Sequence, residues 1–399
     1  MTGSAPGRIR GLDGIRGIAA LFVVINHVYL RAWPGYPETR APFWAAGFIY
    51  GRFAVVVFIV VSGFSLALAP ARAGWRLSST AEFARRRAWR ILPPYWAALV
   101  FSLLMTWFVV AQPGWPVPNA KSVLVNGVLL QDVFVVPSPN RTFWSIAIEA
   151  QLYLLFPLLI LAMRRLHPMA MLGGVAAPVL ALGLFGAAQV GIADNLVTQY
   201  TPDLAVLFAI GVAAAGILRA TDRRSDVPWH WFAVGLAVPV LALIGSRGSV
   251  WTIDNFFWVD MALGPAIACL LIAVATERPR SAVRLLDTRP LRSLGSFSYS
   301  LYLTHAPIVI AVYYGVLRGW VPAGTPTFLV TCAICVPLTV AFARLFAEVF
   351  ELPFQRRRGW VAVRDAVHLD QLVAPGRPFA AGAARARTGS GPTPSSKPG

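Results

Sequence analysis

Two ionisable residues, Arg16 and His27, lie eleven positions apart in the first apolar stretch of the chain. In a helix, eleven steps of about 100° return to within about 20° of the starting direction and rise by about 16 Å. Both side chains are therefore expected on one face of a helix, with the guanidinium near one membrane surface and the imidazole deep in the apolar layer. Because ionisable residues are costly to insert into a membrane, the pair predicts a functional site.

A carboxylate, Glu149, is expected at the same depth as the imidazole. Glu149 lies about six residues into an apolar stretch that runs inward, and His27 lies about six residues before the end of the outward-running first stretch. A carboxylate beside an imidazole holds its tautomer and strengthens it as a base. The two residues thus predict a His–Glu pair that removes a proton from a hydroxyl. The alternative is a buried pair that only locks two helices together.

The composition is that of a protein embedded in a membrane. Of the 399 residues, 57% are hydrophobic and only 13% are charged, whereas a soluble domain has about 25% charged residues. An all-α, polytopic fold of about ten transmembrane helices is predicted, because ten apolar stretches are long enough to span a bilayer. They are residues 17–33, 53–69, 91–110, 143–163, 169–190, 203–218, 229–244, 251–275, 296–317 and 327–350.

The positive charge reflects membrane orientation and not nucleic-acid binding. There are 35 Lys and Arg residues against 17 Asp and Glu, and the basic residues lie in clusters between the apolar stretches. Most of them fall in alternate loops, which predicts that both termini are cytosolic. Residues 1–358 are expected to form the transmembrane domain. Residues 359–399, rich in Ala, Gly, Pro, Ser and Arg, are expected to form a disordered basic cytoplasmic tail without a further enzyme domain.

A second group of candidate residues, Arg86, Arg87 and Arg90, lies at the cytosolic edge near Asp13 and Arg16. Guanidinium groups bind phosphates well, so this group predicts a site for a phosphorylated cofactor beneath the membrane. An orientation signal or contacts with lipid headgroups would explain the same residues. No metal site is expected, because no two His or Cys residues stand at helix-adjacent spacing with an acidic partner.

Two further polar positions, Ser62 and His305, are expected inside the apolar layer. Ser62 precedes a glycine, which favours close helix packing, and the Gly-x-Ser-x-Gly pattern of an activated serine nucleophile is missing around it. His305 ends a hydroxyl-rich stretch that begins at Ser298, and its expected depth is close to that of His27. It either lines the same cavity or joins two helices.

The sequence around these residues resembles the membrane-bound acyltransferase-3 family. The stretch from Leu12 through Asp13, Gly14 and Arg16 to His27 matches the opening block of that family, with its Arg-x10-His signature. Further blocks follow in the family's order, at residues 58–64, 86–95, 143–153, 298–307 and 351–354. Thr304 stands where the family more often has Trp.

The resemblance implies a bacterial plasma-membrane enzyme that moves an acyl group, acetyl being favoured, from acyl-CoA to a hydroxyl of a sugar, surface glycan or glycosylated product. His27 would be the base or an acyl carrier, with Arg16 and Glu149 as essential partners, and Arg86, Arg87 and Arg90 would hold acyl-CoA. The residues expected to line the substrate cavity are Asp13, Ser62, Trp144, Ser145, Tyr302 and His305. Membrane lipid is the other expected partner. A transporter or flippase that uses the buried residues as a proton relay is the competing interpretation.

Overall fold

The computed structural model describes residues 9–111, 114–187, 197, 200–220 and 227–356. Within these ranges the chain is helical and has no strand. Ten helices are long and apolar enough to cross a membrane, and each coincides with one of the ten predicted stretches. The all-α, ten-span prediction is therefore confirmed. The cytosolic placement of the termini stays a prediction, and the predicted tail, 359–399, lies outside the described residues.

The spanning helices, in chain order, are α1 (Leu12–Ala32), α2 (Arg52–Arg72), α3 (Thr80–Leu104), α5 (Trp144–Arg165), α6 (Pro168–Ala187), α8 (Asp203–Ala220), α9 (Trp229–Asp254), α10 (Phe256–Ala275), α13 (Ser298–Val312) and α14 (Thr325–Phe346). Three of them continue into π-helical turns: α3 into η2 (Met105–Val109), α13 into η4 (Tyr313–Leu317) and α14 into η5 (Ala347–Glu351). The short helices are η1 (Ala46–Ile49), α4 (Ala120–Gly127), η3 (Arg141–Phe143), α11 (Arg280–Leu286), α12 (Arg289–Ser296) and α15 (Leu352–Arg356).

Helix α3 begins eleven residues earlier than its apolar stretch indicated, at Thr80 and not at residue 91. The side chain of Ser79 accepts a hydrogen bond from the backbone N–H of Glu82 at 3.3 Å, which caps the helix start. The basic block that precedes residue 91 is therefore helical. The side chains of its arginines therefore point in different directions around the helix, and they do not all line the same site.

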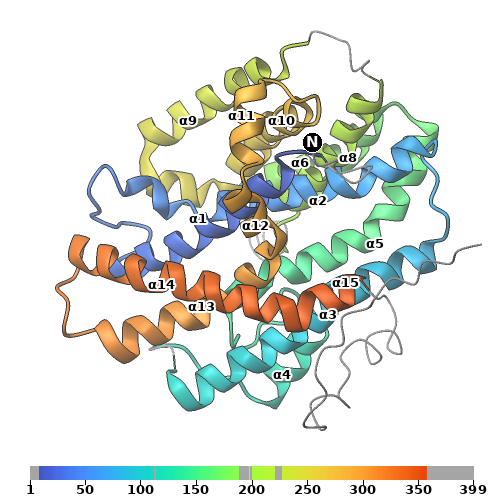
Figure 1. The fold of residues 1–399 in the computed structure, drawn as a ribbon. Helices are drawn as coiled ribbons and strands as arrows, with labels where there is room; N and C mark the ends of the chain where they lie inside the picture. The colour runs from blue at the N-terminus through green and yellow to red at the C-terminus, as the bar shows by residue number, and fades with distance from the viewer. Residues whose placement is uncertain (1–8, 112–113, 188–196, 198–199, 221–226, 357–399) are drawn as a thin grey trace, which may run out of the picture.

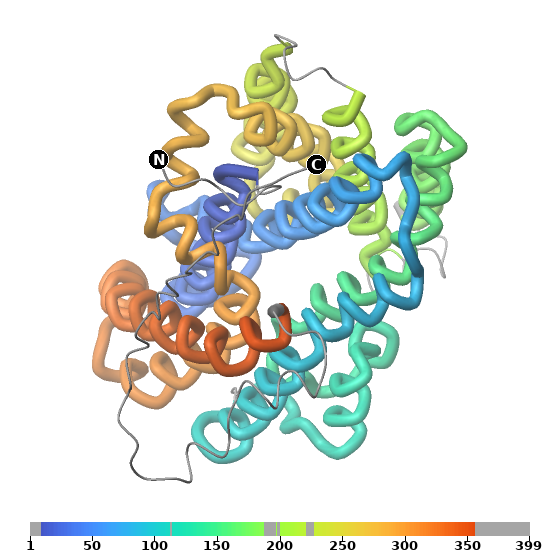
Figure 2. The backbone as a smooth tube through the Cα atoms, turned by 45° about the vertical axis from the view of Figure 1, so that its right-hand side comes forward, coloured from blue at the N-terminus to red at the C-terminus, as the bar shows by residue number. Residues whose placement is uncertain are grey.

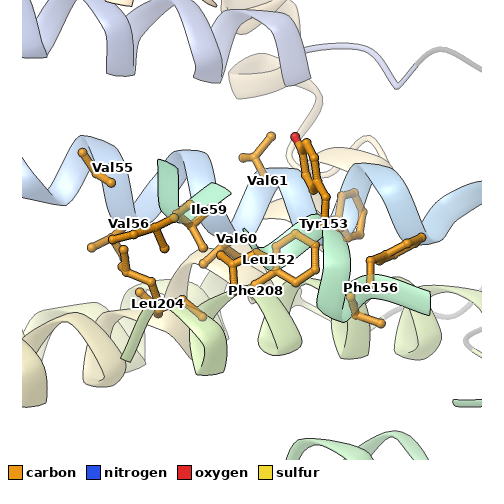
Figure 3. Close-up of a cluster of buried hydrophobic side chains, with 14 of the residues drawn as sticks. Val55, Val56, Ile59, Val60, Val61, Leu152, Tyr153, Phe156, Leu204 and Phe208 are labelled. Carbon is orange, nitrogen blue, oxygen red and sulfur yellow. The ribbon is translucent and has the colours of Figure 1, made fainter. Parts of the chain in front are cut away.

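Helices α2 and α8 pack closely against each other. A Cβ atom on Gly63 would overlap the carbonyl oxygen of Phe208, and one on Gly211 would overlap that of Val60. The two backbones can approach this closely only because neither glycine has a side chain. Figure 3 shows the apolar side chains along this seam, among them those of Ile59 and Leu204. Close packing through small residues, as expected around Ser62, is thus confirmed for its neighbour Gly63.

Helix α1 lies between two groups of helices. It packs against α2 on one side and against α13 and α14 on the other, with α12 alongside its first half (Figures 1 and 2). By contrast, α6 and α9 are peripheral, since only 17% and 11% of their apolar windows are buried inside the protein. This arrangement leaves α6 and α9 to face lipid and places α1, α2 and α13 around the cavities described next.

Candidate functional site

Two cavities lie along α1. The first, of about 300 Å³, is called the Glu149 cavity, and the second, of about 680 Å³, the His27 cavity. Val55 of α2 and Tyr302 of α13 line both, so the two cavities meet at these side chains. The polar residues of the Glu149 cavity are Arg16, Ser62, Ser65, Arg87, Arg90, Ser145, Glu149, Tyr153, Ser298, Tyr299 and Tyr302. Those of the His27 cavity include Asn26, His27, Arg31, Arg52, Asn140, Arg141 and Thr142.

Glu149 is held by two hydroxyl groups. Its Oε1 accepts hydrogen bonds from Ser62 Oγ at 2.9 Å and from Tyr153 Oη at 2.5 Å, and the two hydroxyl oxygens lie 3.1 Å apart. Ser62 belongs to α2, whereas Tyr153 follows Glu149 by one turn of α5. The network orients the carboxylate and joins two helices. Ser62 therefore acts here as a hydrogen-bond donor to a carboxylate.

Three arginines surround this carboxylate on the cavity wall. Arg16 of α1 donates to Ser65 Oγ at 3.1 Å, and its Nη1 lies 3.9 Å from Asp13. Arg87 and Arg90 of α3 complete the set. Arg87 Nε is buried without a hydrogen-bond partner among the described residues. The wall thus presents three guanidinium groups and a single carboxylate.

Two predicted residues, Asp13 and Arg86, lie off this wall. Asp13 is near Arg16 but does not line the cavity. Arg86 forms an ion pair with Glu82 one turn earlier on α3, at 2.7 Å, and does not line the cavity either. Arg86 points away from the cavity wall because a helix sends adjacent side chains about 100° apart, and its predicted role in binding the donor stays a prediction.

His27 in the other cavity is paired with a second histidine. Its Nδ1 lies 2.9 Å from the carbonyl oxygen of Val23 and 3.3 Å from Nε2 of His305, and the two rings meet edge to face. His305 is fully buried, and its Nδ1 contacts the carbonyl oxygens of Leu301 and Tyr302 at 3.1 and 2.8 Å.

These contacts assign the protons of the neutral rings. A carbonyl oxygen only accepts, so Nδ1 carries the hydrogen in both His27 and His305. Nε2 of His305 is then the acceptor that faces Nδ1–H of His27. The lone pair of His27 lies on Nε2, which makes no hydrogen bond to any described residue, and the His27 side chain lines the cavity. His27 thus lines the cavity with a ring whose Nε2 is free of described hydrogen-bond partners.

The predicted contact between His27 and Glu149 is not made. No hydrogen bond or ion pair joins these two described residues, and each lines its own cavity. Equal depth is a necessary condition for such a contact, but it leaves open the direction in which each helix turns its side chains. Ser62 on α2 donates a hydrogen bond to the carboxylate of Glu149, and His305 on α13 contacts the imidazole of His27. The polar partner of His27 is therefore His305.

Tyr302 and Ser145 stand at the meeting point of the two cavities. The hydroxyl oxygens of these residues are 2.7 Å apart, and Tyr302 Oη also donates to the carbonyl oxygen of Thr142 at 3.1 Å. Tyr302 is 5% exposed, so its ring is held firmly between α2, α5 and α13. The phenol thus stands between the two cavities.

A buried ion-pair triad that the sequence interpretation missed supports the His27 cavity from behind. Arg52 donates from Nε to Asp260 at 2.5 Å and from Nη2 to Asp203 at 3.2 Å. Both carboxylates are at most 1% exposed. Trp144 lines the same cavity, and its ring lies 5.2 Å from the Arg52 guanidinium carbon. The three residues come from α2, α8 and α10. Because they lie far apart in the sequence, their spacing gives no sign that they meet.

Comparison with known proteins places the chain in a family. The family model for acyltransferase-3, described as an acyltransferase domain, matches residues 9–344. The chain belongs to the acyltransferase-3 family. No solved structure matches it. With its ten spanning helices, it is a multi-pass membrane protein of this family.

Relatives of this acyltransferase-3 protein carry related names. O-acetyltransferase OatA of Staphylococcus aureus is 23% identical, over 90% of this chain and 59% of the relative. A putative peptidoglycan O-acetyltransferase, YrhL of Bacillus subtilis, is 25% identical, over 76% and 49%. Peptidoglycan O-acetyltransferase OatA of Listeria monocytogenes is 24% identical, over 75% and 49%. The chain thus spans about half to three-fifths of the length of these relatives.

The acyltransferase-3 blocks of the sequence supply the walls of both cavities. The block at 58–64 provides Ser62, the block at 143–153 provides Trp144 and Glu149, and the block at 298–307 provides Tyr302. Several predicted residues therefore line the two cavities, whereas Asp13, Arg86 and His305 line neither. Within the described residues, no cluster of three His, Cys, Asp or Glu side chains is placed to hold a metal ion.

Proposed function

We propose that this acyltransferase-3 protein is an O-acyltransferase of the plasma membrane that moves an acyl group, acetyl being favoured, from acyl-CoA to a sugar hydroxyl. The observation that carries the proposal is the position of His27, whose ring lines one cavity while three arginines line the adjoining one. A membrane carrier needs ionisable residues too, but it has no need for a phosphate-binding wall next to a base.

The donor occupies the Glu149 cavity in this account. Arg87 and Arg90 lie in the first turns of α3, where they meet the phosphates of coenzyme A, and Arg16 lies across the cavity from α1. Guanidinium groups suit phosphates because their fork geometry allows paired hydrogen bonds. The pantetheine arm then points toward Tyr302, which brings the thioester to the passage between the cavities. Glu149 keeps Ser62 and Tyr153 in place along this path.

The acceptor occupies the His27 cavity, and the imidazole acts as a general base. Nε2 of His27 takes the proton of the sugar hydroxyl as its oxygen attacks the thioester carbonyl. The carbon–sulfur bond then breaks, and the leaving sulfur of coenzyme A receives that proton from Nε2. During the step Nδ1–H remains bonded to Val23 and His305, which keeps the ring oriented. If Nε2 itself carries the acyl group first, the kinetics are ping-pong.

The names of the relatives support acetyl as the acyl group and a cell-wall glycan as the acceptor. Two of them are named as peptidoglycan O-acetyltransferases, one of these provisionally, and another as an O-acetyltransferase. Because they are 23% to 25% identical to this chain, the likeness supports the chemistry more strongly than the particular glycan.

The test uses the purified protein in lipid nanodiscs with acetyl-CoA and a mixture of soluble peptidoglycan fragments. The wild type should release free coenzyme A, measured with a thiol reagent, and mass spectrometry should find acetylated sugars. The His27→Ala variant should do neither while still binding acetyl-CoA. A protein that leaves acetyl-CoA unbound and intact under these conditions would refute the proposed function and favour the transport alternative.

A further inference from the structure

Two arginines of the His27 cavity have no acidic partner in the part of the chain that the structure describes. The cavity is lined by Arg31, Arg52 and Arg141 but by no Asp or Glu. Arg52 is neutralised by Asp203 and Asp260, which lie behind the wall. Among the described residues, no carboxylate lies within ion-pair distance of Arg31 or Arg141. Arg31 is half-buried, and a partly buried cation inside a membrane protein is normally paired, so its charge calls for an explanation, whereas Arg141 is exposed and its guanidinium is open to a ligand.

Arg31 has a hydrogen-bond donor that nothing uses. Its Nη1 donates to the hydroxyl of Tyr314 at 3.0 Å, while Nε is buried and has no partner among the described residues. A cation in the last turn of α1 is favoured by the helix dipole, and this accounts for the charge. It does not account for the unused buried N–H, whose loss of hydration is unfavourable.

Arg141 stands where a helix dipole disfavours a cation. Arg141 is the first residue of η3, and η3 leads directly into α5. The N-terminal end of a helix carries a partial positive charge. Its guanidinium carbon lies 3.8 Å from the ring centroid of Trp115, so the group is held flat against an indole. Its N–H donors make no hydrogen bond to described residues. The N-terminus of α5 and Arg141 together direct positive potential into the cavity.

We propose that Arg31 and Arg141 form a subsite for an anionic substituent, a carboxylate or a phosphate, on the sugar that is acylated. The inference rests on the proposed function, because it takes the acceptor to lie in the cavity of His27. Planar guanidinium forks bind carboxylate and phosphate with paired hydrogen bonds. The rings of Tyr36 and Trp144 on the same wall offer apolar faces to the sugar itself.

An anionic lipid headgroup has the same chemistry and is the other source of such a group. The cavity favours the sugar, because its wall also includes His27 and Thr142, which lie next to the passage at Tyr302. A ligand anchored at Arg31 and Arg141 would hold its hydroxyl groups toward that passage. A lipid would bring its headgroup but no sugar hydroxyl to the base.

The test is equilibrium binding of two matched disaccharides, one ending in glucuronic acid and the other in glucose, to the full-length protein in phosphatidylcholine nanodiscs. The uronic acid should bind at least about ten-fold more tightly, since a charge-assisted hydrogen bond contributes about 1.5–3 kcal/mol. Arg141→Gln and Arg31→Gln should each remove most of that preference. Arg247→Gln is the control, because Arg247 contacts Trp251 but does not line the cavity.

Binding separates this inference from the proposed function. His27→Ala should keep the wild-type preference for the uronic acid over glucose, whether or not acyl transfer occurs, and unchanged acetyl-CoA binding by the arginine variants would show that they are folded. Equal binding of the two sugars, binding of neither, or an unaltered preference in both arginine variants would overturn the subsite. Loss of uronic acid binding when phosphatidylglycerol replaces part of the lipid would reassign the two arginines to a headgroup.

Discussion

The Glu149 cavity and the His27 cavity lie along the same helix, α1, yet the charged residues on their walls are paired differently. In the Glu149 cavity a carboxylate is held by two hydroxyls among three arginines. In the His27 cavity the arginines and the imidazole share the wall with no carboxylate, because Asp203 and Asp260 lie behind it. One cavity is thus organised by polar contacts within the protein, while the other leaves donors and a base open to a ligand.

This difference suggests that the two ends of α1 serve different substrates, the donor at one end and the acceptor at the other. Arg16 and His27 share the helix, as their spacing predicted, but they serve separate spaces that meet at Tyr302. A donor and an acceptor that enter from opposite ends would meet at that phenol, so neither needs to cross the whole membrane. Each prediction below changes one cavity and asks whether the other is affected.

The largest effect is expected for His27→Ala. Removal of the base should lower the turnover of acetyl-CoA in the presence of acceptor by about 10²–10⁴-fold, the usual contribution of general-base catalysis. The measurement is thiol release by purified protein in nanodiscs. Binding of acetyl-CoA should be retained, because the change lies outside the Glu149 cavity. Turnover at the wild-type rate would remove His27 from the mechanism.

A smaller loss is expected for His305→Leu, because His305 acts through His27. Removal of one of the two acceptors for Nδ1–H, with the Val23 carbonyl oxygen left in place, should lower kcat by about 10–100-fold, as changes to groups that orient an active imidazole do. The KM for acetyl-CoA should stay the same, whereas a general loss of structure would alter it as well. His167→Leu, at an exposed position, serves as the control. A variant with unchanged kcat would leave His305 with a packing role alone.

Arg90→Gln tests the donor cavity and has a natural control on the same helix. The apparent KM for acetyl-CoA should rise about ten-fold, because one charge-assisted contact to phosphate is lost. Arg86→Gln should change it little, since Arg86 is paired with Glu82 away from the cavity. Steady-state kinetics with acceptor in excess provide both values. An equal rise in the two variants would mean that general surface charge, and not the cavity wall, attracts the donor.

The smallest effect concerns the seam that supports both cavities. Gly63→Ala should lower the free energy of unfolding by about 1–3 kcal/mol, because the added methyl overlaps the carbonyl oxygen of Phe208. Gly235→Ala on α9 has open space around it and should not destabilise. Thermal unfolding in nanodiscs compares the two. Equal stability would indicate that α2 and α8 can separate without loss.

The spanning helices could be predicted from the sequence because a chain that crosses a membrane without a closed barrel must do so as apolar helices. Ten apolar stretches became ten helices, but two boundaries moved substantially. Helix α3 begins eleven residues before residue 91, since hydropathy does not register the cap at Ser79, and α9 ends at Asp254, ten residues after 244. The membership of the site was also largely predicted, as Ser62, Trp144 and Tyr302 line the cavities.

The pairing of the side chains could not be predicted in the same way. Helical spacing gives depth and relative angle on one helix, but contacts between helices depend on how each helix is rotated against its neighbours. The structure therefore pairs His27 with His305 and not with Glu149 as predicted. The triad of Arg52, Asp203 and Asp260 was not predicted. Residues that lie far apart in sequence and meet through tertiary packing leave no local pattern.

The separation of donor and acceptor is tested most directly by titration of radiolabelled acetyl-CoA into the wild type, Arg87→Gln and Arg31→Gln. Arg87 lines the Glu149 cavity and Arg31 the His27 cavity. The dissociation constant should rise about ten-fold in Arg87→Gln and stay at the wild-type value in Arg31→Gln. A rise in Arg31→Gln with no change in Arg87→Gln would place the donor in the His27 cavity and contradict the account.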